Sequence, residues 1–177
     1  MKIIAPLLIC AAAAFPSLSF ADSVVGSWNV MRMGHGEKKD FSSLAKVASH
    51  FDILSVQEVM TEEGFEELRE RLTQMTGMPW DGMVSAARGR GSYKEMYGFL
   101  WRSDRITSVE NAVTYLDPGD LFEREPFAAT FTDADGLRFV LTSVHSIYGK
   151  TEERREAEAA ALGQYYAWLQ ENFPGVP

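Results

Sequence analysis

The chain has 177 residues, a formal net charge of −8 at pH 7 and 46% hydrophobic residues. This composition excludes an intrinsically disordered chain and supplies enough apolar residues for one packed domain. The acidic balance repels nucleic acid on average, so a phosphate-bearing substrate would need a local basic patch and a bound cation.

The first 21 residues have the pattern of a signal peptide. A basic start at 1–2 precedes a mostly apolar run at 3–15, and Ser-Phe-Ala at 19–21 places small residues where signal peptidase requires them. We predict cleavage after Ala21 and export, to the periplasm or out of the cell. The alternative of a retained membrane helix is weaker because the apolar run is shorter than the roughly 20 residues that span a bilayer. The mature chain would then have no integral membrane segment.

The single cysteine, Cys10, lies within this predicted signal peptide. The mature chain would therefore contain no thiol, no disulfide and no cysteine metal site. Such a chain suits an oxidising compartment, where free thiols are trapped as disulfides.

The mature chain opens with a strand, a loop, a helix and a second strand. Residues 23–32 read as the first strand, 42–51 have helical apolar spacing, and 52–59 read as the second strand. A second helix is predicted from Thr61, which can cap it, to about Thr76, with Gly77 ending it.

From residue 80 the pattern changes to strands, followed by one long helix. A hairpin turn is predicted at 133–136, and the last helix at about 151–172, with Thr151 as its cap. The five predicted strands are 80–86, 94–102, 106–115, 127–132 and 137–145. This order predicts an α/β (α+β) domain over residues 22–177, with a mixed sheet and helices packed on one face. Residues 173–177 resemble a loop that feeds another strand, so we expect the natural domain to continue beyond them.

Two of the predicted strands end in oxygen-bearing side chains. The apolar run of 52–59 ends at Gln57 and Glu58, and the first strand carries Asn29 near its end. If the two strands are neighbours, the carboxylate and the amide could together hold a hard cation such as Mg²⁺. The alternative is that Glu58 begins a solvated loop and contacts only water.

A glycine-rich basic loop, Arg-Gly-Arg-Gly-Ser-Tyr-Lys, occupies 88–94. Its flexible backbone would let guanidinium groups such as that of Arg90 follow a phosphate chain, and Tyr93 could lie in a groove or stack. The alternative is an ordinary solvated hairpin loop, which composition alone favours.

Three further residues are candidates for chemistry. Glu95 is in register with aromatic residues on an alternating strand, which predicts partial burial and a need for a cationic partner or a histidine. His145 ends an apolar strand, and a carboxylate on its ring would fix one tautomer and make it an acid able to protonate a leaving alkoxide. Arg124 opens a strand and could clamp a phosphate or pair with Glu125. The alternatives are an edge acid facing water for Glu95 and a loop or capping residue for His145.

Taken together and in order, these segments resemble the successive motifs of the endonuclease/exonuclease/phosphatase superfamily, in its deoxyribonuclease I-like branch. The resemblance covers about residues 23–177 and rests on five motifs: SWNV with Asn29, SVQEV with Glu58, SYKEMYGFLWR with Tyr93 and Glu95, REPF with Arg124, and LTSVHSIYG with His145. It implies a mixed β-sandwich flanked by helices, incomplete at its C-terminal end. It also implies a divalent cation, Mg²⁺ or another such as Mn²⁺ or Ca²⁺, and a phosphodiester substrate.

The resemblance also implies a role for each residue. Glu58 would bind the metal with Asn29 beside it, and His145 would be a general acid oriented by Glu95. The substrate contacts would come from Tyr93 and Arg90 on the nucleic-acid backbone or minor groove, and from Arg124 on a phosphate. The family's later Asp-Asn and Asp-His motifs have no counterpart in these residues. Met60 also stands where this branch tends to carry an arginine that touches DNA.

The sequence therefore predicts the N-terminal portion of an exported, metal-dependent phosphodiesterase, most simply a DNA endonuclease. These residues alone should hydrolyse little, since the metal would have one carboxylate and the attacking water no base. Two alternatives stay open. One is a noncatalytic half that binds a partner or nucleic acid through an exposed sheet face. The other is a phosphodiesterase of the same fold that acts on a phospholipid or a phosphoinositide.

Overall fold

The computed structural model describes residues 23–35, 39–149 and 151–177. The predicted signal peptide and its cleavage site lie outside these residues. Within them, no helix combines the length and the apolar character that crossing a bilayer would need.

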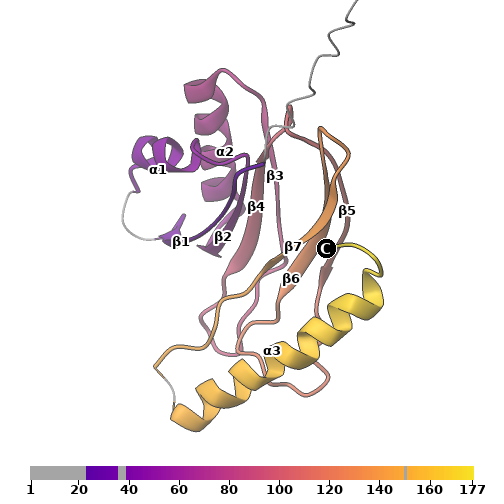
Figure 1. The fold of residues 1–177 in the computed structure, drawn as a ribbon. Helices are drawn as coiled ribbons and strands as arrows, with labels where there is room; N and C mark the ends of the chain where they lie inside the picture. Colours follow the sequence, from indigo (N-terminus) through magenta and orange to yellow (C-terminus); the bar gives the residue numbers. More distant parts are fainter. Residues whose placement is uncertain (1–22, 36–38, 150) are drawn as a thin grey trace, which may run out of the picture.

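The first of two sheets has four strands in the order β1-β2-β4-β3 (Figure 1). They are β1 (Val25–Met33), β2 (Ile53–Val59), β4 (Met96–Arg102) and β3 (Trp80–Val84). The β1–β2 pair is parallel, and β2–β4 and β3–β4 are antiparallel, so the sheet is mixed. The strands β2 and β4 are buried on both faces, which explains why their sequences are continuously apolar.

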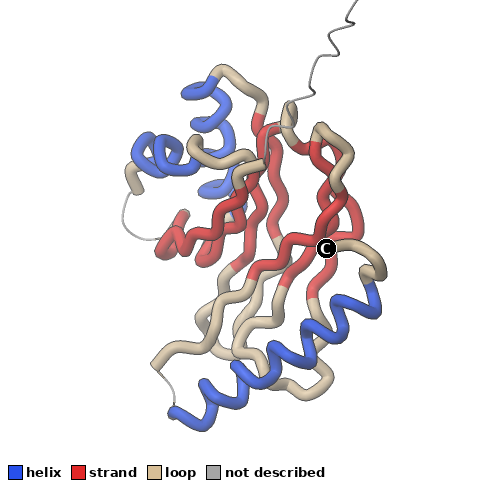
Figure 2. Tube along the Cα trace, viewed as in Figure 1, coloured by secondary structure: helices blue, strands red, loops and turns tan. Residues whose placement is uncertain are grey.

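Helices α1 (Phe41–Ala48) and α2 (Glu62–Thr76) cover the outer face of the first sheet (Figure 2). The hydroxyl of Thr61 accepts a hydrogen bond from the backbone N–H of Gly64 at 3.0 Å, so the predicted cap of α2 is confirmed. Gly77 ends α2 with a φ of 67°, also as predicted. Leu68 and Leu72 of α2 are fully buried against this face.

The second sheet has three antiparallel strands, β5 (Ile106–Thr114), β6 (Phe127–Asp133) and β7 (Arg138–Ser143), in the order β5-β6-β7. The predicted hairpin between β6 and β7 is present. Gly136 in that turn has a φ of 85°, a conformation that glycine adopts without strain.

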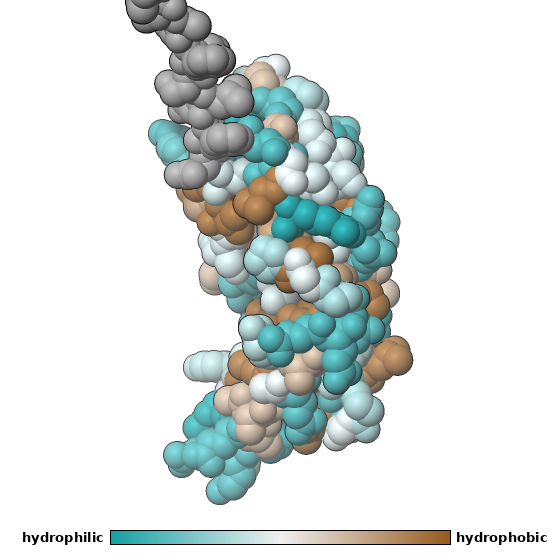
Figure 3. Space-filling view, turned by 45° about the vertical axis from the view of Figure 1, so that its right-hand side comes forward, coloured by the Kyte–Doolittle hydropathy of each residue, from teal (hydrophilic) through white to brown (hydrophobic). Residues whose placement is uncertain are grey.

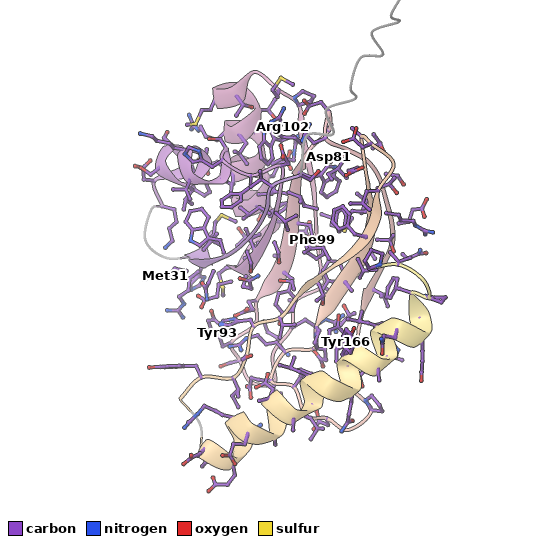
Figure 4. The ribbon with its side chains drawn as sticks, in the orientation of Figure 1. Met31, Asp81, Tyr93, Phe99, Arg102 and Tyr166 are labelled. Carbon is purple, nitrogen blue, oxygen red and sulfur yellow. The ribbon has the colours of Figure 1, made fainter. Side chains whose placement is uncertain are left out.

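The two sheets pack face to face through aromatic side chains. Phe99 of β4 lies between the sheets (Figure 4), with ring centroids 5.4 Å from Phe127 and 5.3 Å from Phe131 of β6. Tyr97 and Trp101 project from the same side of β4 into this layer. The alternation predicted for β4 from Glu95 onward therefore sets which side chains face the second sheet.

Helix α3 (Glu152–Asn172) runs across the ends of the strands of the second sheet (Figure 1). Its Tyr165 packs near Tyr115 and Phe122, which come from the chain between β5 and β6. Thr151 occupies the predicted capping position, but its side chain makes no capping hydrogen bond. The helix is held instead by side-chain packing and by contacts such as the hydrogen bond from the Ile147 N–H to Glu158.

The structure is a two-sheet sandwich of the α/β (α+β) class with helices beside it, as the resemblance implied. The strand pattern alone had suggested one mixed sheet. The strands instead divide into two sheets, and the second is wholly antiparallel in the described residues. Because the order of strands in a sheet depends on contacts distant in sequence, periodicity could not reveal this division.

The two inner sheet faces cover each other, so neither is left open. On the face seen in Figure 3, hydrophobic side chains form separate patches between hydrophilic ones. The outer edge of β7 receives one contact from the chain end, where the Val140 N–H donates to the carbonyl of Pro177 at 2.8 Å. Association through an exposed sheet face stays a prediction.

Candidate active site

Asn29 and Glu58 meet where the pairing of the parallel strands β1 and β2 shifts its register, between Asn29 and Met33 of β1. The Nδ2 amide of Asn29 donates to Oε1 of Glu58 at 2.8 Å, and its Oδ1 accepts from the Met31 N–H at 2.8 Å. Glu58 has a φ of 60°, inside a break in the β2–β4 register between Val56 and Val59. Such an irregularity turns a side chain out of the ordinary strand alternation, here toward the rim of the sheet.

His145 follows β7 and is joined to Glu95, which precedes β4. Its Nδ1 lies 2.6 Å from Oε1 of Glu95, whose side chain is completely buried. A carboxylate can only accept here, so Nδ1 carries the proton and Nε2 is left facing the opposite way. That nitrogen lies 3.8 Å from Oε1 of Glu58 and 3.5 Å from Nδ2 of Asn29.

Arg124 supports this pair from behind. Its Nε lies 3.1 Å from Oε2 of Glu95, an ion pair without the angle of a hydrogen bond, and its Nη1 donates to the carbonyl of His145 at 3.2 Å. The Tyr97 hydroxyl accepts from the His145 N–H at 3.1 Å. The Arg124 side chain is only 12% exposed, so most of its donor capacity is directed into the protein. It balances the charge of Glu95 and fixes the backbone of His145.

Tyr93 lies at the loop end of the sandwich (Figure 4), and two guanidinium groups lie near its ring. The guanidinium carbons of Arg32 and Arg124 lie 5.3 and 5.8 Å from the centre of its ring. Burial, with smaller contributions from Glu58 and Glu95, raises the pKa of Tyr93 above its ordinary value. Its hydroxyl is therefore neutral at pH 7 and able to donate to a phosphate or sugar oxygen.

The structure does not bring Arg90 to this cluster. Its Nε donates to the Phe122 carbonyl at 3.0 Å, and its Nη2 pairs with the carboxylate of Asp120 at 2.9 Å and also contacts the Asp120 carbonyl. The guanidinium thus ties the glycine-rich loop to the segment before β6. Whether Arg90 also contacts substrate stays a prediction.

A buried polar seam joins the strands that carry Glu58 and His145. The Ser143 hydroxyl accepts from Ser55 at 2.8 Å and from Nε2 of Gln57 at 3.0 Å. These bonds link β2 of the first sheet directly to β7 of the second. They fix the distance between the two halves of the site, because hydrogen bonds tolerate little displacement.

Two residues of the site had not been identified from the sequence. Arg32 covers Tyr93 with a φ of 60°, a strained conformation for arginine, and nothing in its local pattern marks it. Glu158 of α3 is 2% exposed and accepts from the Ile147 N–H at 2.7 Å, two residues after His145. A signal for Glu158 did exist, since alanine occupies the positions on both sides of it.

The cluster is suited to a divalent cation. Ligand atoms of Glu58, Glu95 and His145 all lie within 4.8 Å of one another. Both oxygens of Glu95 already face His145 and Arg124, whereas the Glu58 side chain is 17% exposed and can accept a further partner. Magnesium is commonly held by one or two carboxylates together with water and substrate phosphate, so this donor set fits it. The Asn29 amide directs its N–H₂ at Glu58, and a direct ligand role for its oxygen stays a prediction.

Comparisons with known sequences agree with this arrangement. The chain is 40% identical over 160 residues to a deoxyribonuclease of Thioalkalivibrio sp., covering 90% of this chain and 44% of that protein. It is 30% identical over 190 aligned residues to human deoxyribonuclease-1, covering 98% of this chain and 63% of the relative. The chain thus spans about half the length of these curated relatives. No family profile matches it.

Solved structures show the same fold. An endonuclease/exonuclease/phosphatase family protein from Leptotrichia buccalis matches with a TM-score of 0.55 at 16% identity, over 81% of this chain and 61% of that one. Truncated TDP2 of Caenorhabditis elegans matches with a TM-score of 0.53 at 16% identity, over 87% and 58%. The deoxyribonuclease relatives, together with this shared fold, support the assignment of the chain to the deoxyribonuclease I-like branch of the endonuclease/exonuclease/phosphatase superfamily.

Proposed function

We propose that this chain forms part of a metal-dependent phosphodiesterase that hydrolyses DNA. The observation that carries the proposal is the Glu95–His145 pair, with 2.6 Å between the carboxylate and Nδ1, whose outer nitrogen faces Glu58 across 3.8 Å. Acid catalysis requires an imidazole oriented by a carboxylate, which Glu95 supplies on one side of the ring. Cation binding at a phosphate requires an accessible carboxylate, which Glu58 supplies on the other side.

In this proposal His145 acts as the general acid. With Nδ1–H held by Glu95, the protonated ring can give its Nε2 proton to the oxygen that leaves phosphorus. The buried Glu95 carboxylate stabilises the charged ring, and Arg124 keeps that carboxylate from being an uncompensated buried charge. Tyr97 and Arg124 hold the His145 backbone, which limits how far the ring can move from the phosphate.

The cation would be held by Glu58, with Asn29 fixing the orientation of the carboxylate. A divalent cation such as Mg²⁺ supplies charge stabilisation at the nonbridging phosphate oxygens. In the described residues the cluster provides one accessible carboxylate and no second base. We therefore expect these 177 residues alone to hydrolyse DNA weakly or not at all.

DNA is the substrate that the observations favour. The two sequence relatives described above are named deoxyribonucleases, and Tyr93 with the exposed Arg32 forms an aromatic and cationic surface beside the cluster. Such a surface can contact a sugar-phosphate backbone despite the chain's net negative charge. The signal-peptide pattern of 1–21 supports export, to the periplasm or outside the cell.

The proposal is tested by removing the cation and its carboxylate separately. The natural-length protein that contains these residues should nick supercoiled plasmid, lose that activity with a chelator and regain it with Mg²⁺. Glu58→Gln should weaken activation by Mg²⁺, because the amide lacks the charge that binds the cation. Glu67→Gln, on the exposed face of α2, is the matched control. Nicking that persists in chelator, or that Glu58→Gln leaves unchanged, would refute the metal-dependent assignment.

A lipid-directed phosphodiesterase would be identified by comparing two substrates, plasmid and phospholipid vesicles. The unmodified protein would then hydrolyse the vesicles faster than the plasmid. A noncatalytic role would be indicated if the natural-length protein hydrolysed neither substrate with any of Mg²⁺, Mn²⁺ or Ca²⁺.

A further inference from the structure

A small hollow adjoins the His145 cluster, between the glycine-rich loop and the loop that follows β7. Its volume is about 250 Å³. Its lining includes Gly89, Gly91, Tyr93, Arg124, Ile147 and Tyr148. Both loops lie at the same end of the sandwich, where the chain turns toward α3 (Figure 1).

The hollow is continuous with the proposed active site. Tyr93 and Arg124 contribute to both, and Ile147 is only two residues beyond His145. A nucleic-acid strand whose phosphate lay at Nε2 of His145 would therefore place an adjoining nucleotide beside this hollow. Ile147 lines one side of the hollow, and its backbone N–H donates a hydrogen bond to Glu158 at 2.7 Å, which fixes the position of that side.

The walls of the hollow suit a flat, aromatic ligand. Tyr148 is 90% exposed, so its ring has a free face, whereas the neighbouring Ile147 is buried and anchors this loop. A planar ligand on the Tyr148 ring would remove apolar area from water. Gly91 has open space where a side chain would project, so the glycine-rich loop leaves the entrance free.

Polar groups at the rim of the hollow can recognise the edge of such a ligand. Ser92 and Glu123 also line it, and Glu123 is held by Arg154 at 3.6 Å. A serine hydroxyl and a carboxylate both accept from the exocyclic amino groups of bases. A phosphate would be disfavoured near Glu123, so the hollow matches the base of a nucleotide better than its phosphate.

We propose that this hollow is a subsite for one unpaired nucleobase adjoining the phosphate at His145, with the Tyr148 ring as its stacking surface. This inference rests on the proposed function. A base within a duplex is stacked and paired, so it can enter only after unstacking, which costs free energy. The subsite therefore favours single-stranded or frayed DNA over intact duplex.

The test measures binding separately from cleavage. The natural-length protein carrying His145→Ala is titrated, with Mg²⁺ present, into a short fluorescent single strand and into the same strand in a duplex, and anisotropy is read. Loss of one base–aromatic stack weakens single-strand binding by about 5- to 150-fold, which is the effect expected for Tyr148→Ala. Tyr148→Phe should bind as the parent does, since it keeps the ring.

Tyr166→Ala is the matched control, because Tyr166 is also an exposed tyrosine, on α3 (Figure 4), and lies outside the hollow. It should leave both affinities unchanged, and duplex affinity should change less than twofold with Tyr148→Ala. The subsite is refuted if Tyr148→Ala binds the single strand as tightly as the parent, or loses duplex and single-strand affinity equally. Failure of the proposed function would be seen elsewhere, as absence of metal-dependent hydrolysis in the unmodified protein.

Discussion

The helix-covered first sheet and the loop end where the two sheets meet are stabilised in different ways. Beneath α1 and α2 the core consists of fully buried aliphatic side chains such as Leu54, Leu68 and Leu72. At the loop end the buried groups are polar: Glu95 lies between His145 and Arg124, and Glu158 holds the backbone after His145. Buried charge stabilises weakly, but it fixes positions when its partners are well placed. We infer that the first region maintains the fold and the second maintains the geometry of the site.

The largest loss of stability is expected in the first region. Leu68→Ala removes a completely buried side chain from between α2 and the sheet, which should lower the free energy of unfolding by about 2–5 kcal/mol. Urea unfolding followed by circular dichroism measures this change. Leu162→Ala, at a 38% exposed position of α3, is the control and should cost much less. Equal losses for both variants would contradict the assignment of the core.

The packing of α3 gives a pH-dependent prediction. Burial raises the pKa of Tyr165 from 10.0 to about 12. The folded state therefore resists ionisation of this phenol, so its contribution is complete below pH 10 and is lost as the pH rises from 10 toward 12. That contribution is about 3 kcal/mol.

Replacing Tyr165 should reduce this pH dependence. Tyr165→Phe should unfold in urea with a smaller decrease in stability between pH 10 and 12 than the unmodified protein shows. It also loses the 2.5 Å contact with Thr142, which costs about 1 kcal/mol at neutral pH. Tyr166→Phe, at a 62% exposed position, should follow the unmodified protein across the same range. Parallel curves for Tyr165→Phe and the unmodified protein would contradict the burial of that phenol.

In the second region, replacing Glu158 should lower the catalytic rate by displacing the segment that carries His145. Glu158→Ala removes the acceptor of the Ile147 N–H and lets the segment after His145 shift. We expect a decrease in kcat of about tenfold with KM nearly unchanged, because a displaced general acid weakens transition-state stabilisation more than substrate binding. Glu158→Gln keeps an acceptor oxygen and should restore most of kcat. If the two variants behave alike, Glu158 does not act through this hydrogen bond.

The smallest effect is expected for the helix cap at the start of α2, in the first region. Thr61→Ala removes the acceptor for the Gly64 N–H at the start of α2, so stability should decrease by about 1 kcal/mol with no change in kcat. Thermal unfolding and initial rates of nicking measure the two quantities. Thr151→Ala is the comparison, because Thr151 makes no capping hydrogen bond and should cost less.

The elements that sequence predicts well here depend on neighbours in the chain. Thr61 and Gly77 bound α2 as expected, and the turn at Gly136 is present, because caps and turns involve residues only a few positions apart. The polar residues at strand ends, Glu58 and His145, could be identified since a buried strand ending in a titratable group is unusual. Their meeting with Glu95 follows from the order of the strands in the two sheets.

The features that the sequence did not predict depend on contacts between residues far apart in the chain. Composition gives no sign that the Arg90 guanidinium is directed at Asp120 and Phe122, or that Arg32 covers Tyr93. The division into two sheets likewise arises from aromatic packing between β4 and β6. Such contacts are set by tertiary structure, which overrides local pattern.

The central claim is that His145, oriented by Glu95, is the general acid of a phosphodiesterase. It is tested most directly by the rate of plasmid nicking by the natural-length protein with His145→Ala, beside His50→Ala, which changes an exposed histidine that follows α1. We predict a loss of about 10²- to 10⁴-fold for His145→Ala and full activity for His50→Ala. Undiminished nicking by the His145→Ala protein would contradict the assignment.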